Sequence, residues 1–329
     1  MIPLYPLRFE PIYQYRPWGG RRLGHLLSAP LPGEGPIGEA WLLSDRDAHP
    51  SIVAAGPLVG NSLRHLLEQF PVQMLGPLSG HFARYPLLLK FLDVTGKLSV
   101  QVHPSDADKE FLAAGDTGKT EAWVVLEAGH EARIFAGLKS FTRAAVLRQA
   151  IAAGTVADDL ASFTPNPGDA VLIPAGTVHS LSDVVVFEVQ QNSDVTFRLY
   201  DWEHVDPTTG KRRCLQVDQA MACIDFRQGT IGPVTAQVEQ VKPVLREKLV
   251  QCQQFGVTRI QSETPFSVGA QGLPRVLVCL RGSGELDTAG SEYPLRKGDV
   301  MLLPAVVGAC RFRPHGPICM LEISLPQVS

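Results

Sequence analysis

The sequence has no cluster of positive charge and no long apolar run, and both absences exclude classes of protein. Its 329 residues carry a formal net charge of −3 without a run of Lys or Arg, whereas nucleic-acid-binding faces are built from clustered cations. No apolar stretch approaches the ~20 residues that a membrane helix needs. The first ten residues show no basic segment followed by an apolar one, so no signal peptide is expected. We therefore expect a cytoplasmic protein that binds neither nucleic acid nor membranes.

Paired cysteines are lacking as well. The six cysteines form no Cys-x-x-Cys pair, and a chain of this length does not need a disulfide framework. Four of them lie in apolar surroundings, which indicates buried, reduced thiols. A structural zinc site built from cysteines is therefore not expected.

Proline and glycine are frequent, at 26 and 30 residues, and they separate many short apolar runs. Such β-branched runs between turn residues indicate a mainly β fold. The clearest runs are residues 85–92, 98–102, 122–126, 170–173, 184–189, 275–280 and 300–303. Helical patterns are few: 62–70 with Ser62 as its N-cap, about 142–152 ending before Gly154, and a short one over 156–163.

An internal repeat suggests how the chain is organised. Residues 167–175 and 297–305 both carry a Gly-Asp turn, an apolar strand and a Pro-Ala end, and 123–129 are echoed by 276–282. The repeat predicts two related β-barrels with a boundary near residues 229–242. We expect a metal-binding catalytic domain with helical insertions over 1–235 and a degenerate barrel over 236–329. A chance recurrence of Gly-Asp turns is the alternative.

Candidate metal ligands lie in the first copy. Its Pro174, Gly176 and His179 follow Gly168 at the spacing G-x5-P-x-G-x2-H, which resembles the second motif of the cupin superfamily. Upstream, Gln101 and His103 are two residues apart, so on a strand both face the same side, together with Ser99. Glu121 begins the next apolar run. Two imidazoles, a carboxylate and an amide oxygen suit a catalytic Zn²⁺ site that keeps an open position.

The second copy lacks these groups. Counting from Pro304 as from Pro174, the histidine position is Ala309 and the glutamate position falls at about Pro274. We expect two tandem cupin (jelly-roll) barrels with short helical insertions, of which the second binds no metal.

The same residues, with others around them, resemble the type I phosphomannose isomerases of the shorter bacterial kind. The resemblance rests on residues 16–20, 38–41, 86–93, 97–104, 118–123, 174–179, 188–194 and 198–201. The most specific parts are Leu-Ser-x-Gln-x-His-Pro at 98–104 and Gln-Asn-Ser-Asp at 191–194. The C-terminal third resembles the family only as a degenerate cupin barrel, and the chain lacks the large helical domain of longer members.

The resemblance implies a zinc-dependent isomerase that interconverts mannose 6-phosphate and fructose 6-phosphate through an enediol. It implies one Zn²⁺ per chain on Gln101, His103, Glu121 and His179, and an active-site arginine at Arg198. It also implies that six further residues line the pocket. These are Glu39, Lys90, Ser99, Lys119, Glu188 and Asp194.

Roles within that set follow from the chemistry. Glu188 is the first candidate for the general base, with a zinc-bound hydroxide as the alternative. Arg198 would stabilise a developing oxyanion or hold the phosphate. Lys90, Lys119 and Ser99 are the candidates for phosphate recognition.

Two other functions remain open on sequence alone. His103, Glu121 and His179 form a two-His-one-carboxylate set that suits an Fe(II) oxygenase, although Gln101 and the basic pocket residues count against it. A sugar-binding or storage cupin would bind ligand without forming product. The sequence does not indicate the oligomeric state.

Overall fold

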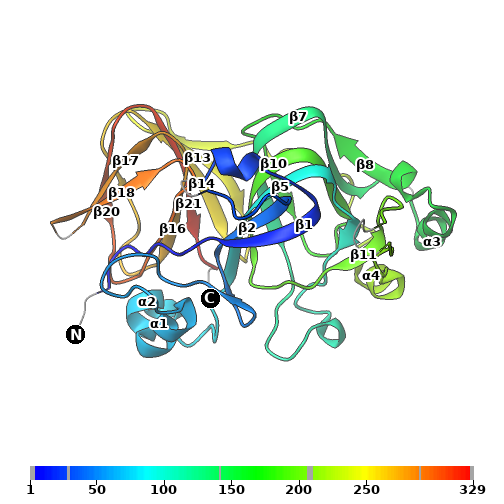
Figure 1. Cartoon of the computed structure of the whole chain (residues 1–329), viewed down its shortest axis with the longest axis horizontal. Helices are drawn as coiled ribbons and strands as arrows, with labels where there is room; N and C mark the ends of the chain where they lie inside the picture. Colours follow the sequence, from blue (N-terminus) through cyan, green and yellow to red (C-terminus); the bar gives the residue numbers. More distant parts are fainter. Residues whose placement is uncertain (1–3, 28–29, 141, 206–209, 289, 327–329) are drawn as a thin grey trace.

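Strands dominate the computed structural model, which describes residues 4–27, 30–140, 142–205, 210–288 and 290–326 (Figure 1). This confirms the expected mainly β fold. The strands of the first part of the chain are β1 (Ile12–Gly20), β2 (Ile37–Leu43), β3 (Asp45–Arg46), β4 (His49–Pro50), β5 (Leu87–Lys97), β6 (Val100–Val102), β7 (Glu121–Leu138), β8 (Leu160–Phe163), β9 (Ala170–Ile173), β10 (His179–Gln191) and β11 (Phe197–Tyr200). Those of the second part are β12 (Gln237–Gln240), β13 (Leu245–Gln251), β14 (Gly256–Ser262), β15 (Phe266–Val268), β16 (Arg275–Arg281), β17 (Ser283–Thr288), β18 (Ser291–Arg296), β19 (Val300–Leu303), β20 (Cys310–Pro314) and β21 (Ile318–Ser324).

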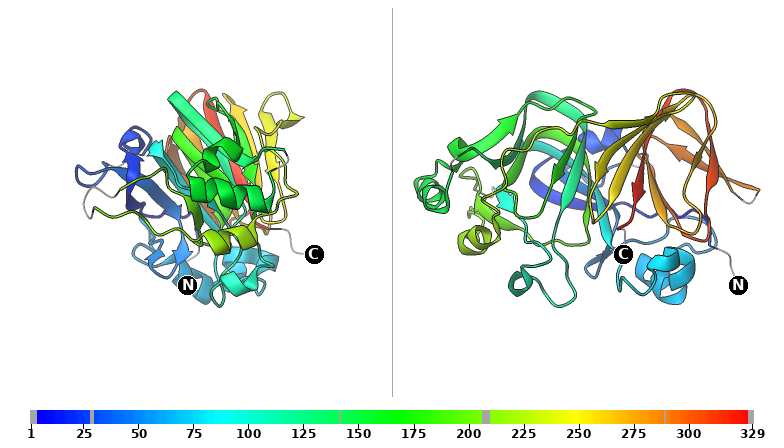
Figure 2. Two further views of the ribbon diagram at one scale, coloured as in Figure 1. Left: turned by 90° about the vertical axis from the view of Figure 1, so that its right-hand side faces the viewer. Right: turned by 180° about the vertical axis from the view of Figure 1, so that it is seen from behind.

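The helices are short and lie outside the sheets (Figure 2). The α-helices are α1 (Leu63–Gln69), α2 (Pro71–Leu75), α3 (Ala144–Ala153) and α4 (Val217–Cys223), and the 3₁₀ turns are η1 (Arg22–His25), η2 (Gly76–Leu78), η3 (Lys109–Phe111) and η4 (Val156–Asp159). Ser62 caps α1 as expected, because its side chain accepts a hydrogen bond from the His65 N–H. Gly154 ends α3 in the left-handed region at φ 72°. None of the helices in the described residues is long and apolar enough to cross a bilayer.

The predicted short helix over 156–163 is wrong. Only η4 forms there, and β8 follows it directly. Ile134 and Phe135 of β7 pair with Phe163 and Ser162 of β8, so the segment gains ladder hydrogen bonds that a second helical turn would lose. Pairing with a distant strand overrides the local helical pattern.

The strands of two separate large sheets pair in the same order. In the first, β2, β5, β10, β7 and β9 pair successively, and we call this the N-terminal sheet. In the second, β13, β14, β21, β16 and β19 pair in the same succession, and we call this the C-terminal sheet. All these pairs are antiparallel. A four-stranded sheet of β15, β20, β17 and β18 faces the C-terminal sheet across a separate apolar core.

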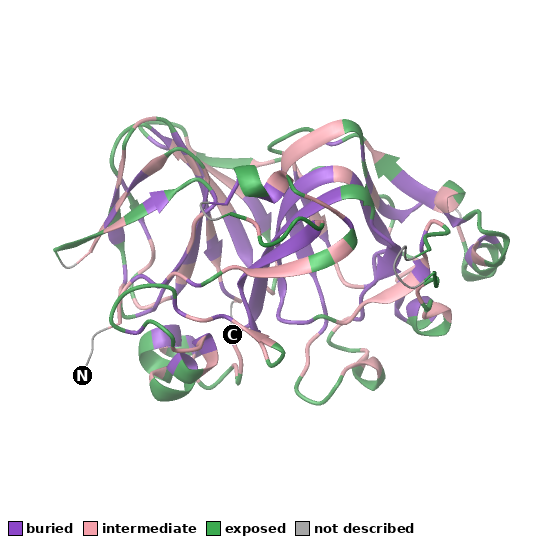
Figure 3. Ribbon diagram, in the orientation of Figure 1, coloured by how far each residue is buried: buried purple, intermediate pink, exposed green. Residues whose placement is uncertain are grey.

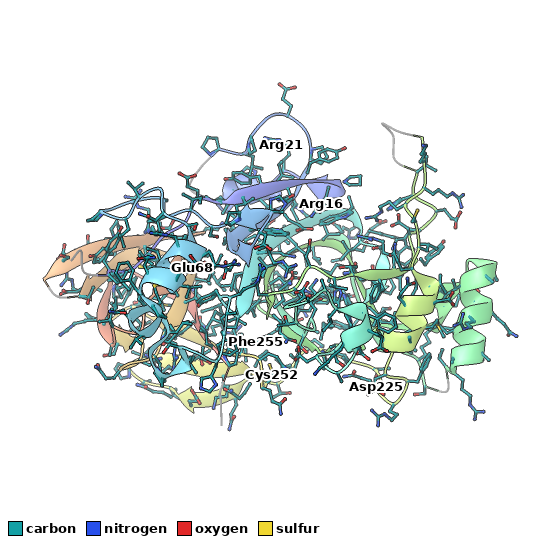
Figure 4. All side chains as sticks on the ribbon, turned by 90° about the horizontal axis from the view of Figure 1, so that it is seen from below. Arg16, Arg21, Glu68, Asp225, Cys252 and Phe255 are labelled. Atoms are coloured by element: carbon teal, nitrogen blue, oxygen red, sulfur yellow. The ribbon has the colours of Figure 1, made fainter. Side chains whose placement is uncertain are left out.

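The outer faces of the two large sheets pack on each other and form the largest apolar core. It contains Leu89 and Phe187 from the N-terminal sheet and Val257 and Val276 from the C-terminal sheet. Figure 3 shows the buried strands between the two halves, and Figure 4 labels Phe255 near the middle of the molecule. The proposed domains 1–235 and 236–329 stay a prediction, since this single core joins both sides of the boundary.

Every second side chain of each strand points to the inner face of the N-terminal sheet, which is the face turned away from the C-terminal sheet. Leu92 and Val94 of β5, Trp123 of β7 and Val186 of β10 form a second apolar cluster. Residues two positions nearer the strand ends are polar and buried, and they include Lys90, Glu121 and Glu188. This arrangement places the candidate site at one end of the inner face.

All six cysteines are free, in agreement with the expected absence of disulfides. Cys223, Cys279 and Cys310 are buried, and Cys252 and Cys319 are half-buried. The prediction of a buried thiol is wrong for Cys214, which is exposed because it lies in the irregular segment between β11 and α4.

Candidate metal centre

Three potential metal ligands converge at the ends of three neighbouring strands. His103 follows β6, Glu121 begins β7 and His179 begins β10. The Glu121 carboxylate lies 3.5 Å from His103 Nε2 and 3.2 Å from His179 Nε2. One ligand atom from each residue lies within 4.8 Å of the other two. Within the described chain this is the one group of three or more His, Cys, Asp or Glu side chains spaced to hold a metal ion.

The cluster contains buried polar atoms without hydrogen-bond partners. They are Nε2 of His103 and both carboxylate oxygens of Glu121. A hydrogen bond at Nδ1 fixes the orientation of each imidazole. His103 Nδ1 donates to the Val195 carbonyl (2.8 Å), and His179 Nδ1 donates to the Thr177 carbonyl (2.9 Å). Nε2 of each ring therefore carries a lone pair directed at the cluster. Orphaned buried acceptors are costly, and a divalent cation among them would satisfy all of them.

Gln101 joins this group from β6. Its backbone pairs with His179 of β10 and with Arg198 of β11, so the three side chains lie on one face. Its amide Nε2 lies 3.2 Å from His179 Nε2, and Ser99 Oγ donates to its Oε1 (3.4 Å). A half-turn of the amide would present its oxygen to the cluster instead.

The surroundings favour the metal-binding protonation states. Burial lowers the pKa of His103 to about 3 and, together with the positive charge of Lys119, also lowers the pKa of His179. Burial alone would raise the pKa of Glu121, but Lys119 and the two histidines outweigh it and hold that pKa well below its usual value. The site thus offers two neutral imidazoles and one carboxylate, as a metal requires.

A second buried polar group lies beside the cluster on β2, β5 and β10. Lys90 Nζ lies 3.4 Å from a Glu188 oxygen and 3.8 Å from a Glu39 oxygen. Trp123 Nε1 donates to Glu188 (2.9 Å), and Trp41 Nε1 donates to Glu39 (2.6 Å). Lys90 is therefore held between two carboxylates at the base of the site.

The two carboxylates differ in acidity. For Glu39 burial is outweighed by Lys90, Arg16 and the Trp41 donor, and its pKa falls to about 2. For Glu188 burial dominates, the negative charge of Glu121 adds to it, and the pKa is raised. One oxygen of Glu188 is buried without a hydrogen-bond partner. Pairs of carboxylates with opposite shifts are typical of catalytic sites.

The remaining predicted residues surround the cluster at different depths. Lys119 is buried with Nζ 3.1 Å from Glu121. Arg198 is half-buried, and its Nε has no hydrogen-bond partner among the described residues. Asp194 is exposed, and its negative charge acts on Lys90 and Arg198.

The chain is similar to proteins of a known family. A family model described as "Phosphomannose isomerase type I, catalytic domain" matches residues 7–123. The chain is 33% identical over 304 residues to the mannose-6-phosphate isomerase ManA of Bacillus subtilis strain 168, covering 92% of this chain and 94% of that protein. This chain belongs to the type I phosphomannose isomerase family.

Other members of the family agree over nearly the whole chain. A mannose-6-phosphate isomerase of Streptococcus mutans serotype c is 31% identical over 313 residues, covering 93% of this chain and 95% of that protein. The crystal structure of the mannose 6-phosphate isomerase from Bacillus subtilis superposes with a TM-score of 0.88 at 30% identity, covering 98% and 99% of the two chains.

Three residues that support the site of this phosphomannose isomerase family member were not singled out from the sequence. Trp41 and Trp123 donate to the two carboxylates, and Arg16 on β1 donates to Glu39 at 2.9 Å. Arg16 is labelled in Figure 4. A signal was present for Trp41, which stands two residues after Glu39 and so shares its face of the strand. The partner of Trp123 depends on the register of β7 against β10, which local sequence does not specify.

Proposed function

We propose that this protein interconverts mannose 6-phosphate and fructose 6-phosphate at a single zinc ion held by Gln101, His103, Glu121 and His179. The observation that carries the proposal is the buried, unsatisfied group of His103, Glu121 and His179 in a chain whose curated relatives are named mannose-6-phosphate isomerases. The six free cysteines suit a reducing compartment such as the cytoplasm.

The reaction moves one proton between C1 and C2 of the open-chain sugar by way of an enediol. A cation bound at the cluster would supply Lewis-acid stabilisation of the negative charge that develops on the sugar oxygens. The chain itself must supply a base for the proton, hydrogen-bond donors for the oxygens, and a dry pocket.

Glu188 fits the role of the base best. Its pKa is raised by burial and by Glu121, which gives a carboxylate more basic than one in water. Lys90 contacts it at 3.4 Å and Trp123 donates to the other oxygen, so the carboxylate is oriented while its Oε1 has no hydrogen-bond partner. Lys119, beside Glu121, would help to neutralise charge at the reacting oxygens.

Arg198 lies directly opposite a proposed metal ligand on the neighbouring strand. Its backbone pairs with Gln101, and its Nε is buried and has no partner within the described chain. Glu39, Lys90, Ser99 and Asp194 would complete the pocket that orients the sugar phosphate.

Removal of divalent metal should abolish the isomerase reaction. After treatment with a chelator and its removal, we expect less than about a hundredth of the original rate, and Zn²⁺ added at one equivalent per chain should restore it. The measurement is a coupled assay with mannose 6-phosphate together with elemental analysis. Undiminished turnover by protein shown to contain no metal would contradict the proposal, and a tightly bound second metal would contradict the expected metal-free C-terminal half.

Trp123→Phe should shift the pH profile of kcat/KM. The indole N–H stabilises the ionised form of Glu188, so its loss raises the pKa of Glu188 further. The base form then needs a higher pH, and the acid limb of the profile moves upward while the plateau is approached at alkaline pH. Trp41→Phe is the matched control, because Trp41 donates to Glu39, and its acid limb should stay in place. An unmoved limb in Trp123→Phe would exclude Glu188 as the titrating base.

A further inference from the structure

The register of the two large sheets aligns their inner faces residue by residue. Ile173 and Leu303 each end a strand before a Pro-Ala pair. Ile173 pairs with Glu121 across β9 and β7, and Leu303 pairs with Arg275 across β19 and β16. The position that carries the carboxylate ligand in the N-terminal sheet is thus Arg275 in the C-terminal sheet, and the sequence-based placement at about Pro274 is wrong by one residue.

The next two strands extend the correspondence. Two residues after Glu121 comes Trp123, which pairs with Glu188 of β10. Two residues after Arg275 comes Leu277, which pairs with Glu322 of β21. Glu188 in turn pairs with Lys90, and Glu322 pairs with Thr258. The C-terminal sheet therefore keeps a half-buried carboxylate at the Glu188 position and has a hydroxyl at the Lys90 position.

The neighbouring strands β2 and β13 carry the last pair of equivalent residues. Glu39 pairs with Leu92, and Arg246 pairs with Ile260, at matching distances from Lys90 and Thr258. Two carboxylates of the first site, Glu39 and Glu121, are thus matched by two arginines. Two positive charges thus replace two negative ones at this end of the inner face, which disfavours a cation and favours an anion.

These residues line a real cavity of about 610 Å³. Its wall carries the polar side chains of Glu239, Arg246, Gln251, Thr258, Arg275, Glu322 and Ser324. In Figure 1 its strands, β13, β14, β16 and β21, lie in the left half, above α1 and α2. The volume is in the range of small-molecule sites.

The guanidinium groups have capacity for a ligand. Arg275 Nε lies 3.7 Å and Arg246 Nη1 lies 3.8 Å from the Glu322 carboxylate, which is long for a hydrogen bond. Glu322 accepts instead from the Gly269 N–H at 3.1 Å. Each guanidinium also donates to a backbone carbonyl, Arg246 Nη2 to Ser267 and Arg275 Nη1 to Pro274, and keeps its other N–H groups for a ligand. Glu239 of the cavity wall is neutralised by Lys248 Nζ at 2.7 Å, so the two arginines facing Glu322 leave one net positive charge beside the Thr258 and Ser324 hydroxyls.

We propose that this cavity is a second ligand site, distinct from the metal centre, that binds a phosphorylated polyol. The two guanidiniums would hold the phosphate, which they suit through their planar donor pairs. The hydroxyls and the Gln251 amide would bind the polyol. The site is independent of the proposed isomerase reaction, because none of its residues belongs to the metal centre.

The test uses calorimetric titration of the full chain with sorbitol 6-phosphate, inorganic phosphate and unphosphorylated sorbitol. We expect sorbitol 6-phosphate to bind at the cavity in wild-type protein and in the His103→Ala variant, which separates this site from the metal centre. Arg275→Leu should weaken that binding at least about tenfold, the usual effect of a lost charged hydrogen bond. Glu322→Gln should strengthen it, because it removes the negative charge but keeps an acceptor for Gly269. Isomerase kcat should be unchanged in both.

Opposite signs for these two variants distinguish a ligand site from an ion cluster that only stabilises the fold. Weakening by both variants, an effect of neither, or equal binding of unphosphorylated sorbitol would overturn the proposal. Equal affinity for inorganic phosphate would overturn the assignment of a polyol. If Arg275→Leu does not fold, the nearly isosteric Glu322→Gln and the charge-conserving Arg275→Lys carry the test, with tighter binding and retained binding as the expected results.

Discussion

His103→Ala should leave a folded protein that holds no metal and turns over mannose 6-phosphate more than ~100-fold more slowly than wild type. The imidazole Nε2 faces Glu121 at 3.5 Å in a fully buried cluster, so no water or neighbouring side chain is placed to substitute for it. Loss of groups that merely orient metal ligands costs ~10–100-fold, and loss of a ligand itself should exceed that.

The measurement that does not depend on activity is thermal unfolding with and without Zn²⁺. A metal that binds only the folded chain raises Tm, so wild type should gain stability with added zinc while His103→Ala should not. His65→Ala, which removes an exposed histidine from α1, is the matched control and should behave as wild type in both assays. Full activity of a metal-free His103→Ala preparation would refute the assigned site.

Arg198→Ala should lower kcat and kcat/KM together by about 10²–10³-fold, the usual loss when one donor to a developing oxyanion is removed from a dry site. Arg198 pairs with Gln101 in register, and burial, with Arg213 nearby, lowers its pKa. Its buried Nε has no hydrogen-bond partner within the described chain, so this donor is available to a bound substrate. Metal content should not change, because Arg198 is not a ligand.

Arg198→Lys and an exposed control, Arg227→Ala, sharpen this test. Lysine keeps the charge but not the planar pair of donors, so a partial recovery of kcat would measure charge alone. Among the described residues Arg227 pairs with Asp225 alone, on the surface, and its removal should leave the kinetics unchanged. A rise in KM with kcat near wild type would instead assign Arg198 to phosphate binding.

The grouping of His103, Glu121 and His179 could be predicted from the sequence because most of its signals are local. Gln101 and His103 share a strand face by their spacing alone, and the Pro-x-Gly-x-x-His motif places His179 where β10 begins. Convergence of these groups with Glu121 is the part that the structure adds. The roles of these residues, metal binding included, stay predictions.

What the sequence did not predict depends on contacts between distant strands. The hydrogen bond from Trp123 to Glu188 joins residues 65 positions apart, and the equivalence of Glu121 with Arg275 follows only from strand register. The failed helix over 156–163 has the same origin, since its last residues pair with β7. β1 was also missed, because Pro17, Gly19 and Gly20 interrupt its pattern.

The apolar layer between the two large sheets constrains how this chain can vary. Residues such as Val257 and Val276 turn toward the N-terminal sheet and cover the backs of the strands that carry Lys90 and Glu188. Those outward residues must remain apolar whatever the second half binds, whereas residues on its opposite face, such as Arg275 and Thr258, are not constrained by this layer. Along β14 and β16, polar substitution should therefore be tolerated at the inward positions but not at the alternating outward ones. The C-terminal half thus serves as a wall behind the strands of the metal centre, and the side chains of its inner face are set by other requirements.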